Sequence, residues 1–279
     1  MIELHTSQIS DYRTCPRLYY FRNVEHLAPK VDSPKLFLGS AVHYGIAAYY
    51  TKQDPFEAYD QYTTEFNNDD KELIKQIDLG RKLLEAYITF AQARDNFEAV
   101  AIEQQFAVPL WAPDLESTVP GVMHVGRFDG IVRDDYGKLW LLEHKTCASY
   151  PSEIELRLNE QAGYYLLAAR QLFDEPIIGF VYNLIRKVDP AKAKTPIVER
   201  RRVTRTETEL KNLVGRLYRV YDQIVNDKNF DPNPGMHCNW KCAYQQLCLG
   251  IEDGIDIAEM KEELFEVKNP YESVCKEVD

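Results

Sequence analysis

A strand, a tight turn and a second strand stand in the middle of the chain and predict a β-hairpin. Residues 122–133 and 139–147 alternate apolar and polar side chains with the period of two that strands show. The Asp-Asp-Tyr-Gly segment at 134–137 is a turn signal. We expect residues 135–137 to form the loop, with Gly137 in the left-handed conformation that such loops favour.

This hairpin brings two carboxylates together. The expected loop pairs Asp134 with Lys138. The same register sets Asp129 opposite Glu143, and opposite Cβ atoms lie about 5 Å apart, so unscreened carboxylates there repel. A divalent cation or a lysine would neutralise them, and Lys145 shares the strand face of Glu143. Acids that merely face water are the alternative, but the apolar residues around both acids favour buried strands.

The whole chain predicts a mixed α/β fold. Its 279 residues can bury a large core without covalent cross-links. Helices, a strand meander, a helix, strands and a last helix follow one another, which indicates the α/β or α+β class with a central mixed sheet flanked by helices. The expected helices are Ser7 or Ser10 to Tyr20, Leu38–Tyr50, Lys71–Arg94, Ile154–Leu172 and Glu207–Val225, and the expected strands are Ala99–Pro109, Val122–Arg133, Leu139–Cys147, Phe180–Arg186 and Val198–Thr204.

Charge is distributed unevenly. The net charge of −11 argues against a passive nucleic-acid coat, because binding to phosphate backbones needs Lys and Arg. We expect one domain over residues 1–250 and an acidic tail over 251–279, which is either a partner-docking helix or a solubilising end. Residues 186–205 are basic around the three arginines at 200–202. They indicate either a solvated strand edge or a patch that tracks phosphates.

Six cysteines are too few for a disulfide scaffold in a chain of this length. We find no signal peptide and no membrane span, and expect a cytoplasmic protein in which clustered cysteines indicate a metal site or catalysis. Cys238, Cys242 and Cys248 lie close together, and Cys15 would tie the start of the chain to them. Four thiolates fit [4Fe–4S] or Zn²⁺ alike, and buried thiols that fill a core are the alternative. The other two cysteines, expected to be structural or free thiols, are Cys147 and Cys275.

The hairpin motif resembles the D…ExK core of the PD-(D/E)xK nuclease superfamily. Gly-Arg-Phe-Asp at 126–129 is followed by Glu-His-Lys-Thr at 143–146, with Phe128 in place of the usual Pro. Gly-Ser-Ala-Val-His at 39–43 resembles the upstream helix whose His is a metal ligand in the RecB-like branch. Gln-Ala-Gly-Tyr-Tyr at 161–165 resembles its QxxxY motif. The matching elements lie in the family's order.

The cysteines extend this resemblance to a subgroup. Cys15, Cys238, Cys242 and Cys248 resemble the split iron–sulfur staple of AddB-type and CRISPR-associated RecB-like exonucleases. The gap between Cys238 and Cys242 is three residues, whereas two is the usual spacing. The resemblance implies a structural [4Fe–4S] cluster that clasps the two ends of the chain, with Zn²⁺ as the less favoured occupant.

The resemblance also implies roles for the core residues. His43, Asp129, Glu143 and the main-chain carbonyl of His144 would bind Mg²⁺ or Mn²⁺, and Lys145 would orient the attacking water. The expected activity is a DNA exonuclease that acts on ends or single strands and leaves 5′-phosphate and 3′-hydroxyl products. DNA is the expected partner, together with repair, recombination, replication or defence proteins.

Three supporting residues have more than one interpretation. Gln161 and Tyr165 lie four apart on one helical face and would help to hold the site or the DNA backbone. A surface Gln beside a core Tyr is the alternative. Glu103 could be a further acid of the site, although a solvated strand residue is favoured.

Two other classes of function compete with the nuclease. One is a nuclease-like subunit without catalysis that binds DNA ends for a larger complex. The other is a zinc-stabilised scaffold with incidental acids. The complete set of Asp129, Glu143 and Lys145 favours the nuclease, because simple binding does not require a Lys two residues after a buried Glu.

Overall fold

The structure is a computed structural model that describes residues 1–30, 34–64, 66, 70–240 and 242–271. It divides into two compact units. Unit 1 comprises the described residues of 1–32, 107–126 and 211–279, and unit 2 those of 33–106 and 127–210. Cys275 and the residues after it lie outside the described part of the chain.

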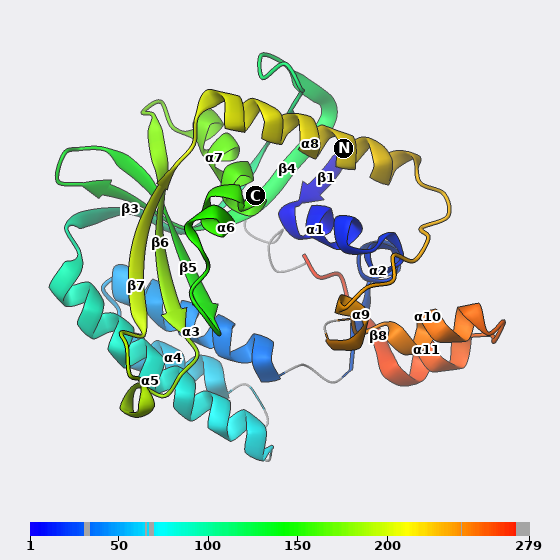
Figure 1. The fold of residues 1–279 in the computed structure, drawn as a ribbon, viewed down its shortest axis with the longest axis horizontal. Helices are drawn as coiled ribbons and strands as arrows, with labels where there is room; N and C mark the ends of the chain where they lie inside the picture. The colour runs from blue at the N-terminus through cyan, green and yellow to red at the C-terminus, as the bar shows by residue number, and fades with distance from the viewer. Residues whose placement is uncertain (31–33, 65, 67–69, 241, 272–279) are drawn as a thin grey trace. The chain divides into compact units, whose positions relative to one another are not determined.

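Unit 2 holds the longer strands and the helices that cover them. Helices α3 and α5 pack on one another and against the strands β5, β6 and β7, while α6 and α7 lie against β6 and β7 from the other side (Figure 1). Its elements are α3 (Pro34–Tyr50), α4 (Pro55–Thr64), α5 (Lys71–Arg94), β5 (Leu139–Cys147), α6 (Glu153–Leu158), α7 (Glu160–Leu172), β6 (Ile177–Arg186), η2 (Pro190–Lys192) and β7 (Val198–Thr204). Three elements run from one unit into the other: β3 (Phe97–Trp111), β4 (Thr118–Asp134) and α8 (Glu207–Asn226).

The sheet is mixed, as expected from the sequence. Its strand order is β1-β4-β5-β6-β7, with β3 also paired to β4. The pairs β4–β5 and β6–β7 are antiparallel, whereas β5–β6 and β1–β4 are parallel. The prediction of a mixed α/β fold with a central sheet flanked by helices is confirmed.

Apolar faces of the helices make the core of unit 2. The fully buried side chains include Leu38, Val42 and Ile46 on α3 and Leu83 and Leu84 on α5. Asp70 caps the start of α5 by accepting a hydrogen bond from a backbone N–H of the first turn, which satisfies a donor that the helix itself leaves free. This layer supports the strands that carry the hairpin residues.

One of the helices expected from the sequence is divided into two helices in the structure. The sequence predicts a continuous helix over residues 154–172, but α6 ends at Leu158 and α7 begins at Glu160. Asn159 between them has an extended backbone, and its side chain accepts a hydrogen bond from the Ala162 N–H. Asn competes with the helix in this way because its short side chain can bond the neighbouring backbone.

Unit 1 is built from short elements around a small aromatic core. Phe21, Tyr244, Leu247 and Phe265 are buried together in it. Strand β1 pairs in parallel with residues 122–125 of β4. The elements of unit 1 are β1 (Ile2–His5), α1 (Thr6–Thr14), α2 (Pro16–Tyr19), η1 (Tyr20–Val24), β2 (Leu27–Pro29), α9 (His237–Trp240), α10 (Gln245–Glu252), α11 (Ala258–Leu264) and β8 (Phe265–Val267).

The acidic segment after Gly250 has regular structure where it is described. It contains α11 and then β8, which pairs with β2 in an antiparallel two-stranded sheet. Lys261 of α11 forms an ion pair with Glu25 at 2.6 Å between Nζ and Oε2. Among the described residues, no helix is both long enough and apolar enough to cross a membrane.

Candidate active site

The hairpin has the register that the sequence predicts. Gly137 has a φ of +74°, and the Asp134 N–H donates to the Lys138 carbonyl at 2.9 Å. The ladder pairs Gly130 with Leu142, so the same register continued by one residue places Asp129 opposite Glu143. The predicted register is therefore confirmed as far as Gly130 and Leu142, and the charge of Asp129 acts on Glu143.

Asp129 is held by the backbone of the neighbouring strand. Its Oδ2 accepts a hydrogen bond from the His144 N–H at 2.8 Å, and the same oxygen lies 3.7 Å from Nδ1 of His43 on α3. The Asp129 side chain is 18% exposed. A residue from an upstream helix and two from the hairpin thus meet around one carboxylate.

Glu143 is the more deeply buried acid. Its side chain is 7% exposed, and its Oε1 lies 3.3 Å from the Nζ of Lys145, which is 26% exposed. Because these residues are two apart on a strand, their side chains leave the same face. The amine can therefore reach both the carboxylate and solvent.

The negative charges of Asp129 and Glu143 are only partly compensated by nearby positive charge. Burial raises the pKa of Asp129 to about 7, although the His144 N–H acts in the opposite direction. Burial, and then the charge of Asp129, raise the pKa of Glu143 to about 7, while Lys145 opposes this rise. Burial lowers the pKa of His43, which favours the neutral imidazole that can bind a metal. Lys145 and Arg127 therefore offset only part of the effect of burial, and a bound cation would offset more of it.

Gln161 and Tyr165 lie beside these acids on α7. The Gln161 Nε2 donates to the Tyr165 hydroxyl at 3.2 Å. The Tyr165 ring packs edge-on against Phe106 and Phe128. Burial, and then the charge of Glu143, raise the pKa of the Tyr165 hydroxyl, so this group stays protonated and can donate a hydrogen bond. Their roles in catalysis or DNA binding stay predictions.

Comparisons with known proteins agree with this geometry. Residues 4–249 match the model of the PD-(D/E)XK nuclease superfamily. The chain belongs to the PD-(D/E)XK nuclease superfamily. No curated protein matches the chain.

The chain is also similar to solved structures at low sequence identity. A provisionally assigned exonuclease from Eubacterium rectale is 12% identical, with 87% of each chain covered and a TM-score of 0.51. The crystal structure of SSO0001 is 15% identical and has a TM-score of 0.42, with 88% of this chain and 85% of that chain covered.

Donors expected of a PD-(D/E)XK metal site are present in the hairpin. Oxygen donors from Asp129 and Glu143 suit Mg²⁺ or Mn²⁺, and their raised pKa values mark buried charge that a cation would offset. Within the part of the chain that the structure describes, no three His, Cys, Asp or Glu side chains are gathered to hold a metal. Asp129 is instead bonded to the His144 N–H, and Glu143 contacts Lys145.

Glu103 corrects one expectation from the sequence. It is not a solvated strand residue, because it is 29% exposed and pairs with Arg127 at 2.8 Å between Oε2 and Nε. Burial, opposed by Arg127, raises its pKa, and its charge also acts on Asp129. The residue has a φ of +51°, a backbone conformation that is uncommon outside Gly. The Glu103–Arg127 pair is thus part of the electrostatic surroundings of the PD-(D/E)XK site.

The side chain of His144 points into a buried polar network on the other face of β5. Its Nδ1 lies 3.4 Å from the Asn183 Nδ2, which also donates to the Tyr87 hydroxyl at 3.1 Å. The Asn183 Oδ1 accepts from the Arg200 Nε at 2.7 Å, and Arg200 pairs with Asp95 at 2.6 Å. Asn183 could not be recognised from the sequence, because a single Asn in an apolar strand becomes informative only when its partners are known.

The structure also bears on the interpretation of the basic run as a patch that tracks phosphates, because Arg200 is largely shielded from solvent. Its side chain is 13% exposed and stacks over Phe97 with its guanidinium 4.8 Å from the ring centre, so it is not available to track phosphates. Arg201 pairs with Glu199 at 2.6 Å. Arg202 lies over the Trp140 ring at 5.1 Å. The three central arginines of the basic run therefore make contacts within unit 2.

The four cysteines of the expected cluster lie in unit 1 and are free thiols. Burial, and then the charges of Cys15, Cys238 and Cys248, raise the pKa of Cys242. Among the described residues, however, no three of these thiols are gathered closely enough to hold a metal. Arg17 Nη1 lies 3.6 Å from the Cys248 sulfur as a donor. The Asn233 N–H donates to the Cys15 sulfur at 3.3 Å. Sulfur donors with such hydrogen bonds suit an iron–sulfur cluster or Zn²⁺.

Proposed function

We propose that the protein is a DNA nuclease of the RecB-like branch that depends on Mg²⁺ or Mn²⁺ and acts as an exonuclease on ends or single strands. The observation that carries this proposal is the buried pair Asp129 and Glu143 with Lys145 beside it. Membership of the nuclease superfamily supports the phosphodiesterase chemistry. The structural neighbour from Eubacterium rectale, itself provisionally assigned as an exonuclease, supports the exonucleolytic mode.

His43, Asp129, Glu143 and the main-chain carbonyl of His144 would hold the metal ion. When bound, such an ion makes a water more acidic and offsets the charge that develops on the phosphate oxygens. The His144 N–H orients the Asp129 carboxylate by a hydrogen bond of 2.8 Å. The buried surroundings of Glu143 exclude bulk water, which strengthens every charge interaction at the site.

Lys145 would position the attacking water. Its Nζ lies 3.3 Å from Glu143 and reaches solvent, so a water could contact both groups. Attack on the phosphorus from this side, with loss of the 3′-oxygen, would leave 5′-phosphate and 3′-hydroxyl products.

Cys15, Cys238, Cys242 and Cys248 would hold a [4Fe–4S] cluster, with Zn²⁺ as the alternative occupant. The charges of the other three thiols act on Cys242, which supports this proposal. Because metal binding at such a site is coupled to folding, the cluster would be structural rather than redox-active. Anaerobically purified protein should then be brown, absorb near 400 nm and contain iron.

The experiment that tests the function is cleavage of a labelled single strand with Mn²⁺, with EDTA, and by the Lys145→Ala variant. Cleavage that EDTA and the variant both suppress supports the proposal. Lys138→Ala in the same hairpin is the matched control, because Lys138 is exposed and lies outside the site. Wild-type protein that binds DNA ends but cleaves nothing would instead favour the non-catalytic subunit.

A further inference from the structure

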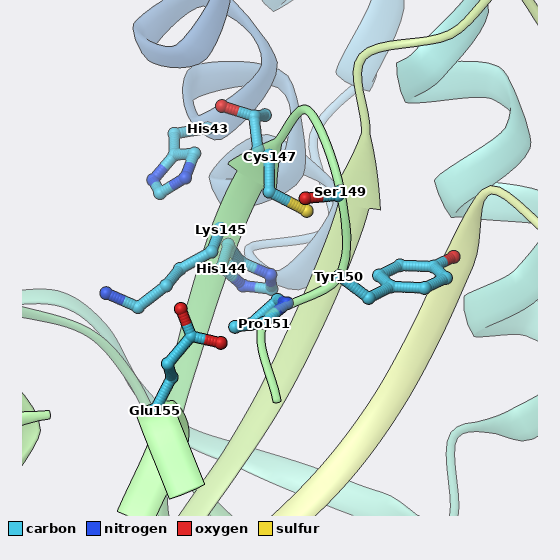
Figure 2. A pocket seen from close by; sticks show the side chains of 9 residues that line it. His43, His144, Lys145, Cys147, Ser149, Tyr150, Pro151 and Glu155 are labelled. Carbon is cyan, nitrogen blue, oxygen red and sulfur yellow. The ribbon is translucent and has the colours of Figure 1, made fainter. Parts of the chain in front are cut away.

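A cavity of about 480 Å³ opens beside the catalytic residues, at the end of β5. Its volume lies in the range of sites that bind small molecules, roughly 300–1,000 Å³. Figure 2 shows the Glu155 carboxylate on the same side of the cavity as the Lys145 amine. The residues that line it are His43, His144, Lys145, Thr146, Cys147, Ser149, Tyr150, Pro151 and Glu155.

The wall of this cavity is held in place. The Tyr150 hydroxyl donates to the Pro196 carbonyl at 2.8 Å, and the Tyr150 ring packs against the Arg186 guanidinium at 5.3 Å. Arg201 Nη1 donates to the Pro151 carbonyl at 2.6 Å. The loop between β5 and α6 is therefore fixed from several sides, and the cavity is formed before any ligand arrives.

The charges of the cavity are unusual for a nuclease. Among its lining residues, Lys145 is the one Lys or Arg, and it contacts Glu143 of the catalytic pair. Glu155 is exposed, and hydrogen bonds from the Ser152 N–H and hydroxyl lower the pKa of its carboxyl, which keeps it ionised at neutral pH. A DNA backbone that continued through the cavity would bring phosphates next to this exposed anion, while the guanidinium groups of Arg186 and Arg201 are engaged with the wall at Tyr150 and Pro151.

We propose that this cavity, which we call the end pocket, receives the terminal nucleoside of a DNA strand whose end carries a hydroxyl group rather than a phosphate. The inference rests on the proposed function, because His43 and Lys145 both line the end pocket and flank the catalytic carboxylates. A strand with its scissile phosphate at Lys145 would place its neighbouring nucleoside here.

Glu155 is the residue that would select the end. A carboxylate has about four lone-pair positions, so it can accept from a terminal hydroxyl as well as from the Ser152 N–H. A terminal phosphate carries a charge of about −1.5 to −2 at pH 7 and would be repelled. Thr146 and Ser149 add hydroxyl groups that can hydrogen-bond to the sugar or base.

The test measures binding first, so that it does not depend on cleavage. Fluorescence anisotropy in EDTA gives the Kd of single strands that differ only in a hydroxyl or a phosphate at the 3′ end or at the 5′ end. We expect the hydroxyl form to bind about tenfold more tightly at one of the two ends, because like charges in an interface are strongly unfavourable. The end that shows the difference identifies the terminus that the pocket holds.

The variant Glu155→Gln should reduce this difference to less than about twofold by improving binding of the phosphorylated end. Gln at this position can still form the capping box with Ser152, so α6 should remain intact. Glu153→Gln is the matched control on the same helix, because Glu153 is exposed and does not line the cavity. It should keep the wild-type preference.

A second variant tests the cavity itself. Ser149→Trp should fill the end pocket and weaken binding of the hydroxyl end about tenfold, to the level of the phosphorylated end. The inference would be overturned if the wild type bound all four strands equally. It would also be overturned if the end preference persisted in both Glu155→Gln and Ser149→Trp. An end preference in a protein that cleaves no DNA would refute the nuclease proposal and leave the end pocket standing.

Discussion

The hairpin site and the four-cysteine site are assembled in different ways. Asp129, Glu143 and Lys145 lie on one hairpin, and strand register alone brings them together. Cys15 and Cys242 come from segments near opposite ends of the chain. The first site depends on a short connection, while the second needs a long loop to close, which costs more conformational entropy.

The two sites also differ in what holds them without an ion. The hairpin is fixed by its ladder, and Asp129 already has a hydrogen-bond partner in the His144 N–H. Cys242 is held among thiols whose charges raise its pKa after burial does. If both sites bind the proposed metals, the hairpin would keep its geometry without the ion and gain function from it, whereas the cysteine site would gain stability from its metal.

The change with the largest expected effect is Asp129→Asn. We expect cleavage to fall by at least about 10²–10³-fold, because a charged ligand of the ion is lost. The melting temperature of the metal-free protein should stay the same or rise, since the substitution removes a buried acid with a raised pKa. Asp135→Asn, in the exposed loop of the same hairpin, should behave as wild type in both measurements. Wild-type cleavage by Asp129→Asn would disprove the role of the hairpin.

Cys242→Ser should instead change the metal content and the melting temperature of the protein. The protein should lose its bound iron or zinc and melt about 10 °C lower, because metal binding at a four-thiolate site contributes folding free energy. Metal content and calorimetry measure both quantities. Cys147→Ser is the control, since Cys147 is a free thiol in unit 2. If Cys242→Ser keeps its metal and its melting temperature, the four cysteines do not form a structural site.

The hairpin could be predicted because its geometry is local. A turn signal and strand alternation suffice to place Asp129 opposite Glu143, and β5 and β7 have the bounds that alternation predicts. Arg200 could not be predicted, because the same basic side chain at a sheet edge can bind phosphate or, as here, pair with Asp95. Its role depends on a contact between distant segments. The short strand β1 was missed for a similar reason, since its pairing with β4 is non-local.

The free energy of unfolding should depend on pH through the two acids of the hairpin. Asp129 and Glu143 have pKa values raised to about 7, so the folded protein holds protons that the unfolded chain would release near pH 4. Their contribution to stability is fully present below the unfolded pKa values and is lost as pH rises through about 7. The metal-free melting temperature should therefore fall by a few degrees between about pH 5 and pH 8.

Mn²⁺ should reverse this fall, because it replaces the protons on the two acids. The stabilisation by Mn²⁺ should grow with pH over the same interval and shrink in Asp129→Asn. Melting curves with and without Mn²⁺ across this range measure it. A stabilisation by Mn²⁺ that is independent of pH would show that the ion does not displace protons from this pair.

A smaller effect on cleavage than that of Asp129→Asn is expected from the network behind the hairpin. Asn183 is fully buried at 0% exposure and joins His144, Tyr87 and Arg200. Because the His144 N–H orients Asp129, Asn183→Leu should lower kcat about tenfold through misplacement of the strand, while the Kd for DNA stays the same. The melting temperature should also fall by about 5–10 °C, since polar partners are left unsatisfied.

Leu184→Ala on the same strand separates positioning from stability. Leu184 is equally buried, but it leaves the opposite face of β6 and has no part in the His144 network. Its truncation costs about 2–5 kcal/mol and lowers the melting temperature at least as much as Asn183→Leu. Measured well below both transitions, Leu184→Ala should retain nearly wild-type kcat. If both variants slow cleavage equally, the network supports the fold alone, and the catalytic geometry of the hairpin is set by its own register.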